Sequence, residues 1–225
     1  MRLLSSDEGI EDVIARLRAA APPPEPPKPV NLGALRLSRC DARGVPNHYQ
    51  VREIIRDGAR ETKAVSAVAS TVSAYMKVRS DEKAVGSLPT LMVLCGPPRT
   101  GKTVALSFAV AAVDASALYV TTYQLADYPR MTRSYEDSPW NRLRQVDVLA
   151  IDELHADETV IPRVKSLIYE RWDNGRCTLL GGNLTVGVFM ERYLCDPALR
   201  RRVAEEYESG RLRHLEFAAT VKELG

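Results

Sequence analysis

Residues 91–103, LMVLCGPPRTGKT, decide the fold of this chain. The apolar run 91–95 predicts a buried strand, and residues 96–103, called the glycine loop below, carry the pattern G-x-x-x-x-G-K-T. The apolar residues 104–113 then predict a helix. In this context the glycines let the backbone wrap a phosphate chain, and the helix presents its free N–H groups to the anion. The stretch therefore predicts a site for a nucleoside triphosphate.

Every residue of the glycine loop is a candidate contact for that nucleotide. Lys102 would reach the outer phosphates and the Thr103 hydroxyl would ligate Mg²⁺, so ATP and Mg²⁺ are the expected cofactors. Arg99 stands where such loops most often carry another glycine, and a positive φ there would cost about 1–2 kcal/mol. The candidate nucleotide-binding residues are Gly96, Pro97, Pro98, Arg99, Thr100, Gly101, Lys102 and Thr103.

Strand-like and helix-like segments alternate along the rest of the chain. Short apolar runs typical of buried strands occupy residues 117–121, 146–151, 177–181 and 212–217. Helical patterns lie at residues 104–113, 158–174 and 185–208. The alternation favours an α/β fold in which a parallel sheet of about five strands is flanked by helices on both faces.

Two acidic residues follow one of these strands, and ligands gather at the carboxyl ends of parallel strands. Asp152 and Glu153 come directly after the run 146–151. We expect Asp152 to hold the Mg²⁺ shell together with Thr103. Glu153 is the candidate that polarises a water molecule for attack on the γ-phosphate.

Further polar residues follow the next strand. The amide of Asn183 would hydrogen-bond the attacking water or the γ-phosphate, unless it caps the next helix. Residues 200–202 are three consecutive arginines. They are either a solvated charged face or the source of an arginine that stabilises the phosphoryl group in a neighbouring subunit's site.

Composition excludes several classes of protein. The 225 residues include 31 basic and 29 acidic side chains, so a net charge of +2 gives no global attraction to nucleic acid or to an anionic membrane. The four cysteines show no C-x-x-C spacing, which favours a reducing compartment. With no apolar run of about 18 residues and an acidic N-terminal segment, we expect a cytoplasmic protein without a membrane span or secretory signal.

The N-terminal third predicts separate units ahead of a core at residues 90–225. An amphipathic helix is expected within residues 1–20, a proline-rich linker at residues 21–30, and a helical lead-in to the core at residues 31–89, with its main helix at 61–78. The first helix either folds back onto the core or docks into the groove of a partner.

Taken in order, these motifs resemble the AAA+ ATPases, and specifically the DnaC-type helicase loaders and IstB-type transposase helpers. The resemblance implies a P-loop AAA+ core with little or no C-terminal lid domain, and it identifies Arg202 as the arginine supplied to a neighbouring subunit. The matching segments are residues 96–103 as Walker A, 148–153 as Walker B, 182–185 as sensor 1, 196–203 as the arginine-finger stretch and 42–46 as a Gly-Val-Pro element.

The resemblance also implies a function: an ATPase that oligomerises on ATP and single-stranded DNA and loads a replicative helicase. A transposase helper, a nucleotide-gated adaptor with little turnover and a small-molecule P-loop kinase are the alternatives. The aromatic and basic side chains between the second and third strands form either a single-strand binding surface or an ordinary mixed surface. They are Tyr123, Tyr128, Arg130, Arg133, Tyr135, Trp140, Arg142 and Arg144.

Overall fold

The structure is a computed structural model. It describes residues 38–47, 91–113, 115–128, 138–155, 159–194, 196, 205, 208 and 212–216. The predicted N-terminal helix, the proline-rich linker, the helix at 61–78, Arg202 and any segment after residue 217 lie outside the described residues.

A five-stranded parallel sheet forms the centre of the described chain, in the order β2-β3-β4-β1-β5. Its strands are β1 (Leu91–Cys95), β2 (Ala117–Thr121), β3 (Val148–Leu154), β4 (Cys177–Gly182) and β5 (Leu212–Glu216). Strands β1 and β4 are buried along their whole length, which fits their unbroken apolar or small residues. The predicted α/β fold with a parallel sheet of five strands is confirmed.

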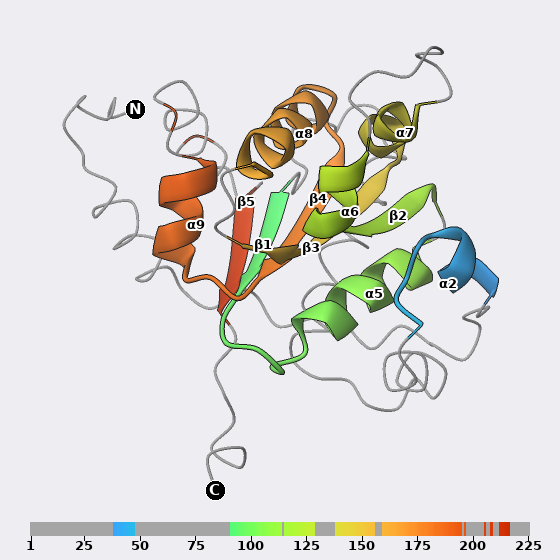
Figure 1. Ribbon diagram of the computed structural model, residues 1–225, viewed down its shortest axis with the longest axis horizontal. Coiled ribbons are helices and arrows are strands. Elements are labelled where there is room, and N and C mark those ends of the chain that lie inside the picture. Colours follow the sequence, from blue (N-terminus) through green and yellow to red (C-terminus); the bar gives the residue numbers. More distant parts are fainter. Residues whose placement is uncertain are drawn as a thin grey trace, which may run out of the picture.

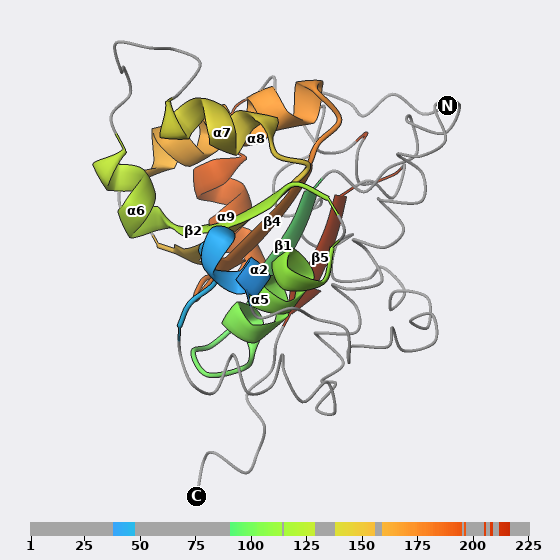
Figure 2. The same ribbon diagram turned by 90° about the vertical axis from the view of Figure 1, so that its right-hand side faces the viewer.

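Helices cover both faces of this sheet, so the described chain has three layers (Figures 1 and 2). On one face lie α2 (Ser38–Ala42) and α5 (Lys102–Ala112). On the other face lie α6 (Thr122–Asp127), α7 (Pro139–Gln145), α8 (Ile161–Asp173) and α9 (Val186–Tyr193).

The two faces bury separate apolar clusters. Leu118, Val120 and Ile151 pack among the residues of α6, α7, α8 and α9, whereas Tyr119 and Ala150 pack against α5. Neighbouring residues of a strand point to opposite faces, so β1, β2, β3 and β4 each contribute to both clusters. This alternation fixes which side chains of β2 and β3 reach the helix that follows the glycine loop.

Three predicted boundaries are wrong. The third strand begins at Val148, because Val146 is the C-cap of α7, and it continues through Asp152 and Glu153 to Leu154. The helix predicted at 185–208 ends at Tyr193, where Leu194 leaves helical geometry with ψ 16°. Pro197 follows shortly after and restricts the residue before it to an extended conformation.

Two helices between β2 and β3 were not predicted. The sequence carried a signal for each. Thr121 and Gln124 form a capping box at the start of α6, and Pro139 occupies the first turn of α7, where its missing N–H has no cost.

Candidate functional site

The candidate site lies where the glycine loop, the end of β3 and the end of β4 meet. Strand β4 pairs with β1 on one side and β3 on the other. The N–H of Gly96 donates to the carbonyl of Leu184, at 3.2 Å, which ties the start of the loop to the segment after β4. Sequence reasoning did not predict this contact, since nothing in the motifs indicates which strands are neighbours.

The glycine loop contains three residues with positive φ. Gly96 has φ 138° and Gly101 has φ 95°, both favoured by glycine, and Arg99 has φ 62°. Arg99 therefore takes the left-handed conformation, and it bears the cost given above for a positive φ at this position. Gly101 is the N-cap of α5 and makes no side-chain capping bond, so a bound anion could reach the free N–H groups of the first turn.

Lys102 lies at the centre of the loop with only 6% of its surface exposed. Its Nζ donates to the carbonyls of Gly96, at 2.9 Å, and Pro97, at 2.5 Å, and to the Thr100 hydroxyl, at 3.2 Å. Burial lowers the pKa of Lys102, and the nearby Asp152 carboxylate opposes that shift. Phosphate oxygens would compensate the charge more fully than these carbonyls, because they are themselves charged.

A β-bulge at the end of β3 sets the two acidic residues apart. Pairing with β4 passes from Ile151 opposite Leu180 directly to Leu154 opposite Gly182. Asp152 and Glu153 thus face the single residue Gly181, and the backbone at Glu153 takes φ 58°. The bulge leaves Asp152 buried and turns Glu153 to the surface.

Asp152 is held by two hydrogen bonds. The Tyr119 hydroxyl donates to its Oδ2 at 2.7 Å, and the N–H of Glu153 donates to its Oδ1 at 2.8 Å. Gly181 leaves the room for this carboxylate, because a Cβ there would lie 2.8 Å from Oδ1. Sequence reasoning missed both Gly181 and Tyr119. Tyr119 looks like an ordinary core residue in an apolar run.

The donor set fits Mg²⁺. Thr103 and Asp152 offer hard oxygen ligands, and the Tyr119 hydroxyl holds the Asp152 carboxylate. The described residues contain no group of three or more His, Cys, Asp or Glu placed to hold a metal by themselves. Mg²⁺ at nucleotide sites needs no such cage, since phosphates and water complete its shell.

Glu153 is held through its backbone by the start of α6. The Thr122 hydroxyl donates to the Glu153 carbonyl at 2.7 Å and lies 3.3 Å from Nε2 of His155. Because the single hydroxyl hydrogen goes to the carbonyl, Nε2 of His155 is the donor in the second contact. The backbone of Glu153 is thereby held at the edge of the sheet, and its side chain is exposed. Thr122 and His155 were not among the predicted site residues.

Asn183 follows β4 at the same edge and is exposed. The alternative in which it caps the next helix is wrong, because Thr185 is the N-cap of α9 and its hydroxyl accepts from the N–H of Val188 at 3.2 Å. The structure therefore brings together the glycine loop, Asp152, Glu153 and Asn183.

The predicted Gly-Val-Pro element anchors α2 far from the glycine loop, at the C-terminal end of α5. The Arg43 guanidinium donates to the carbonyls of Val110, Val113 and Ala115, at 2.6 to 2.9 Å. Gly44 lies against β2, since a Cβ there would be 2.6 Å from the carbonyl oxygen of Tyr119. The described part of this element is a structural clamp.

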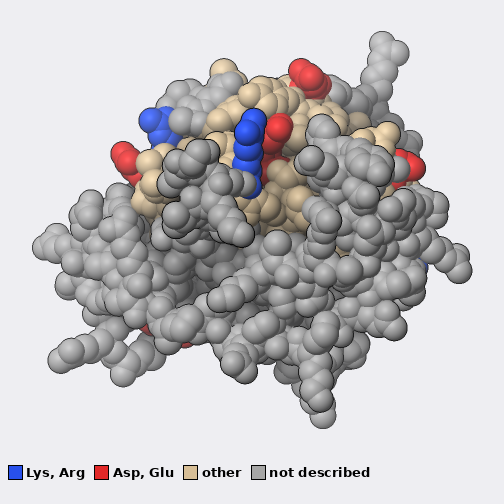
Figure 3. Space-filling view, turned by 90° about the horizontal axis from the view of Figure 1, so that it is seen from below, with Lys and Arg blue, Asp and Glu red and all other residues tan. Residues whose placement is uncertain are grey.

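The segment of interleaved aromatic and basic residues is divided among several environments. Tyr123 is 61% exposed, whereas Tyr128 and Trp140 pack against the core and Arg144 pairs with Glu170. On the one face shown in Figure 3, the described acidic and basic side chains are interspersed and form no basic patch. Arg130, Arg133 and Tyr135 lie outside the described residues.

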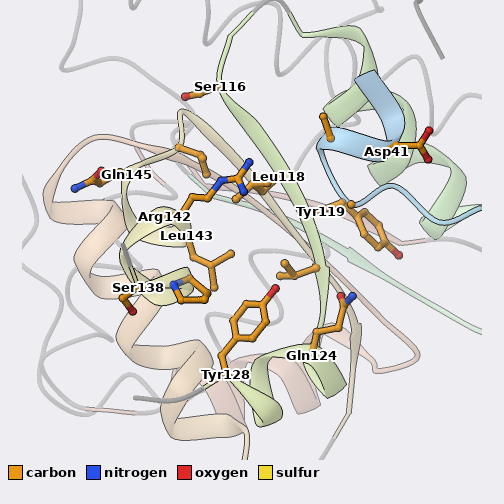
Figure 4. A pocket seen from close by; sticks show the side chains of 15 residues that line it. Asp41, Ser116, Leu118, Tyr119, Gln124, Tyr128, Ser138, Arg142, Leu143 and Gln145 are labelled. Carbon is orange, nitrogen blue, oxygen red and sulfur yellow. The ribbon is translucent and has the colours of Figure 1, made fainter. Parts of the chain in front are cut away.

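A cavity of about 730 Å³ lies beside the edge strand β2, away from the glycine loop. Tyr128 and Arg142 point into it, and Leu118 and Leu143 line its floor (Figure 4). No residue of the glycine loop lines this cavity. It is therefore separate from the candidate nucleotide site.

The described cysteines, Cys40, Cys95 and Cys177, are buried free thiols. None of the described helices has the length and apolar character needed to cross a bilayer.

A scan of protein-family models finds no match to this chain, and a search of curated proteins finds none either. Solved structures do match. A DnaC helicase loader aligns over 76% of this chain and 100% of its own, with 14% identity and a TM-score of 0.52. DnaI aligns over 74% of this chain and 94% of its own, with 16% identity and a TM-score of 0.48.

AMPPCP-bound DnaA from Aquifex aeolicus aligns over 78% of this chain, with 16% identity and a TM-score of 0.48. The match covers 52% of that DnaA chain, so this chain spans about half the length of the replication initiation proteins it matches. At such identities the likeness concerns the fold, and the DnaC loader carries it. This chain shares its fold with the DnaC helicase loader.

Proposed function

We propose that this protein binds ATP with Mg²⁺, hydrolyses it, and uses the cycle to load a replicative helicase during DNA replication. One observation carries the hydrolase part of the proposal. The glycine loop lies at the same sheet edge as a bulge that buries one carboxylate, Asp152, and exposes the next, Glu153. Metal binding and water activation require these two different environments.

Each residue of the site then has a chemical role. The backbone of the glycine loop and Lys102 bind the phosphates, and Thr103 and Asp152 hold Mg²⁺, which neutralises phosphate charge when bound. Glu153 accepts the proton of the attacking water. Asn183 hydrogen-bonds that water or the γ-phosphate. Arg202 of a neighbouring subunit completes the site in a homo-oligomer.

The replication role is proposed from the likeness in fold. One solved structure with this fold is described as a helicase loader, and others are described as replication initiation proteins. We propose single-stranded DNA and a replicative helicase as partners, with residues 1–20 as the docking helix. A transposase in place of the helicase is the alternative partner.

Three single-residue variants, one at a lysine and two at glutamates, test the proposed binding and hydrolysis of ATP. Lys102→Ala should lose ATP binding, because it removes the cation at the phosphates. Glu153→Gln should keep ATP binding and lose about 100-fold or more in hydrolysis, the usual contribution of a general base. Glu191→Gln, on the exposed side of α9, is the matched control and should behave as wild type.

The measurements are fluorescent ATP binding and phosphate release at several protein concentrations, with and without single-stranded DNA. Hydrolysis per subunit should rise with protein concentration and with DNA if Arg202 acts across subunits. A Glu153→Gln protein that hydrolyses ATP like wild type would exclude the assigned mechanism.

Partner choice needs a separate experiment. The full chain and a chain lacking residues 1–30 are each tested for capture of purified replicative helicase and of a transposase. Helicase captured by the full chain alone supports the proposal, and transposase captured instead replaces it. If Glu153→Gln still loads helicase, the protein is a nucleotide-gated adaptor.

A further inference from the structure

Tyr119 lies inside the sheet, next to the candidate magnesium site. It occupies the middle of β2, opposite Ala150 of β3, and its side chain is on the α5 face with only 3% of its surface exposed. Asp152 lies one step further along the same face of β3, opposite Thr121. A tyrosine at this diagonal position reaches past its neighbour to the carboxylate.

The hydroxyl of Tyr119 joins β2 to the end of β3. It donates to Oδ2 of Asp152 at 2.7 Å. A phenol has one hydrogen to donate, and that hydrogen goes to Asp152.

The orientation of a carboxylate matters when it ligates a metal. Oδ2 of Asp152 accepts from Tyr119, and Oδ1 accepts from the N–H of Glu153 at 2.8 Å, so both oxygens have a fixed orientation.

We propose that Tyr119 is a positioning residue that orients Asp152 for Mg²⁺, an inference that rests on the proposed ATP and Mg²⁺ site. It acts through the Asp152 carboxylate. Its contribution is to metal affinity, because second partners of metal ligands typically change affinity or activity by roughly 10- to 100-fold.

The test is Tyr119→Phe, which removes the hydroxyl and keeps the ring. Binding of a fluorescent ADP is titrated with Mg²⁺ and repeated in EDTA. We expect unchanged metal-free ADP affinity and a rise of about tenfold or more in the Mg²⁺ concentration needed for half-maximal tight binding. An unchanged Mg²⁺ requirement in a folded Tyr119→Phe protein overturns the proposal.

Thr178→Val is the matched control. It also removes one buried hydroxyl, the acceptor of Nε of Arg171 at 3.0 Å, but at the opposite end of the sheet. Both variants should lower thermal stability, and only Tyr119→Phe should change the Mg²⁺ requirement. Equal changes in both would show a general effect of lost stability and overturn the positioning role.

A measurement on the wild-type chain covers the case in which Tyr119→Phe does not fold. The protein is labelled with 3-fluorotyrosine, and ¹⁹F spectra are recorded with ADP before and after Mg²⁺. A tyrosine signal should shift with metal in wild type and not in Asp152→Asn, and absence of any metal-dependent shift overturns the proposal. If wild type binds no nucleotide at all, the proposed function itself fails.

Discussion

Arg99 carries a backbone strain that the rest of the glycine loop avoids. Its φ of 62° lies in the left-handed region, where a side chain costs about 1–2 kcal/mol. Its side chain is exposed, so packing does not offset that cost. A glycine at position 99 would lose more conformational entropy on folding than another residue, at a cost of about 0.5–1 kcal/mol. This cost reduces the stability gained by relieving the backbone strain but does not cancel it.

We therefore predict that Arg99→Gly stabilises the protein by about 0.5–1 kcal/mol in urea unfolding without nucleotide. Arg142→Gly is the control, because Arg142 is equally exposed but lies in helix α7, where glycine should destabilise by up to about 1 kcal/mol. Equal losses from both substitutions would show that Arg99 is not strained.

At the same scale, the sequence predicted the acidic residues of the site but not their different environments. Asp152 and Glu153 are adjacent letters after an apolar run, and that pattern indicates a strand end. Their separation into a buried and an exposed side chain depends on the bulge opposite Gly181. To predict a bulge one must know which strand pairs with β3, and the local periodicity of the sequence does not contain that information.

Helix α8 carries two arginines that use the same chemistry in different surroundings. Arg171 is fully buried and donates to the carbonyls of Leu143, Val146 and Cys177 at 2.6 to 2.8 Å. Arg163 is half-buried and donates to the carbonyls of Leu125, Ala126 and Tyr128 at 2.6 to 2.9 Å. If the guanidinium is removed, only the carbonyls around Arg163 can hydrogen-bond to water instead.

Arg171→Met should therefore cost at least about 3 kcal/mol of folding free energy, because several buried acceptors lose their donor. Arg163→Met should cost about 1 kcal/mol, the usual net value of a hydrogen-bonded group near the surface. Urea unfolding followed by circular dichroism measures both. Similar losses would contradict the role assigned to burial.

The sequence predicted the elements that have a recognisable apolar pattern. It did not predict the helices that are defined mainly by their capping residues. The sequence located all five strands, of which four are apolar or nearly apolar runs and the fifth, at 212–216, mixes leucines with polar residues. It missed α6 and α7, which are too short to show a helical period and are marked by the capping box at Thr121 and by Pro139 in the first turn. It extended the helix after Asn183 too far, because helical spacing continues past the point where Leu194 ends α9.

On the scale of the whole molecule, the strand order places β4 between the strand of the glycine loop and the strand of the acidic residues. Because β4 lies between them, β1 and β3 are two strand spacings apart, which is about 10 Å. That distance leaves space for phosphates and a metal between Lys102 and Glu153, with Asn183 following the middle strand. The order of elements along the chain did not predict this insertion.

The sheet also gives the molecule a pH-dependent stability that can be measured without any ligand. Burial raises the pKa of the Cys177 thiol to about 12, and it raises the pKa of Tyr119 as well. Both groups keep their protons in the folded chain and lose them on unfolding at alkaline pH. Their contribution to stability is therefore complete below about pH 8.5 and is lost as the pH rises. Burial lowers the pKa of Lys102, so just below pH 10.5 the unfolded chain holds this proton more tightly than the folded chain does. In that range Lys102 makes the free energy of unfolding rise with pH, opposite to the effect of the thiol and the phenol.

We predict that the free energy of unfolding falls between pH 9 and pH 11, and that Cys177→Ala makes this fall shallower by about 1.4 kcal/mol per pH unit, the value for one proton. The measurement is urea unfolding of both proteins at half-unit steps of pH. Between pH 6 and pH 8 the two curves should run parallel, since neither folded nor unfolded thiol ionises there to a large extent. Identical slopes above pH 9 would mean that the thiol reaches solvent in the folded chain, and that the sheet interior around β4 is less closed than its burial indicates.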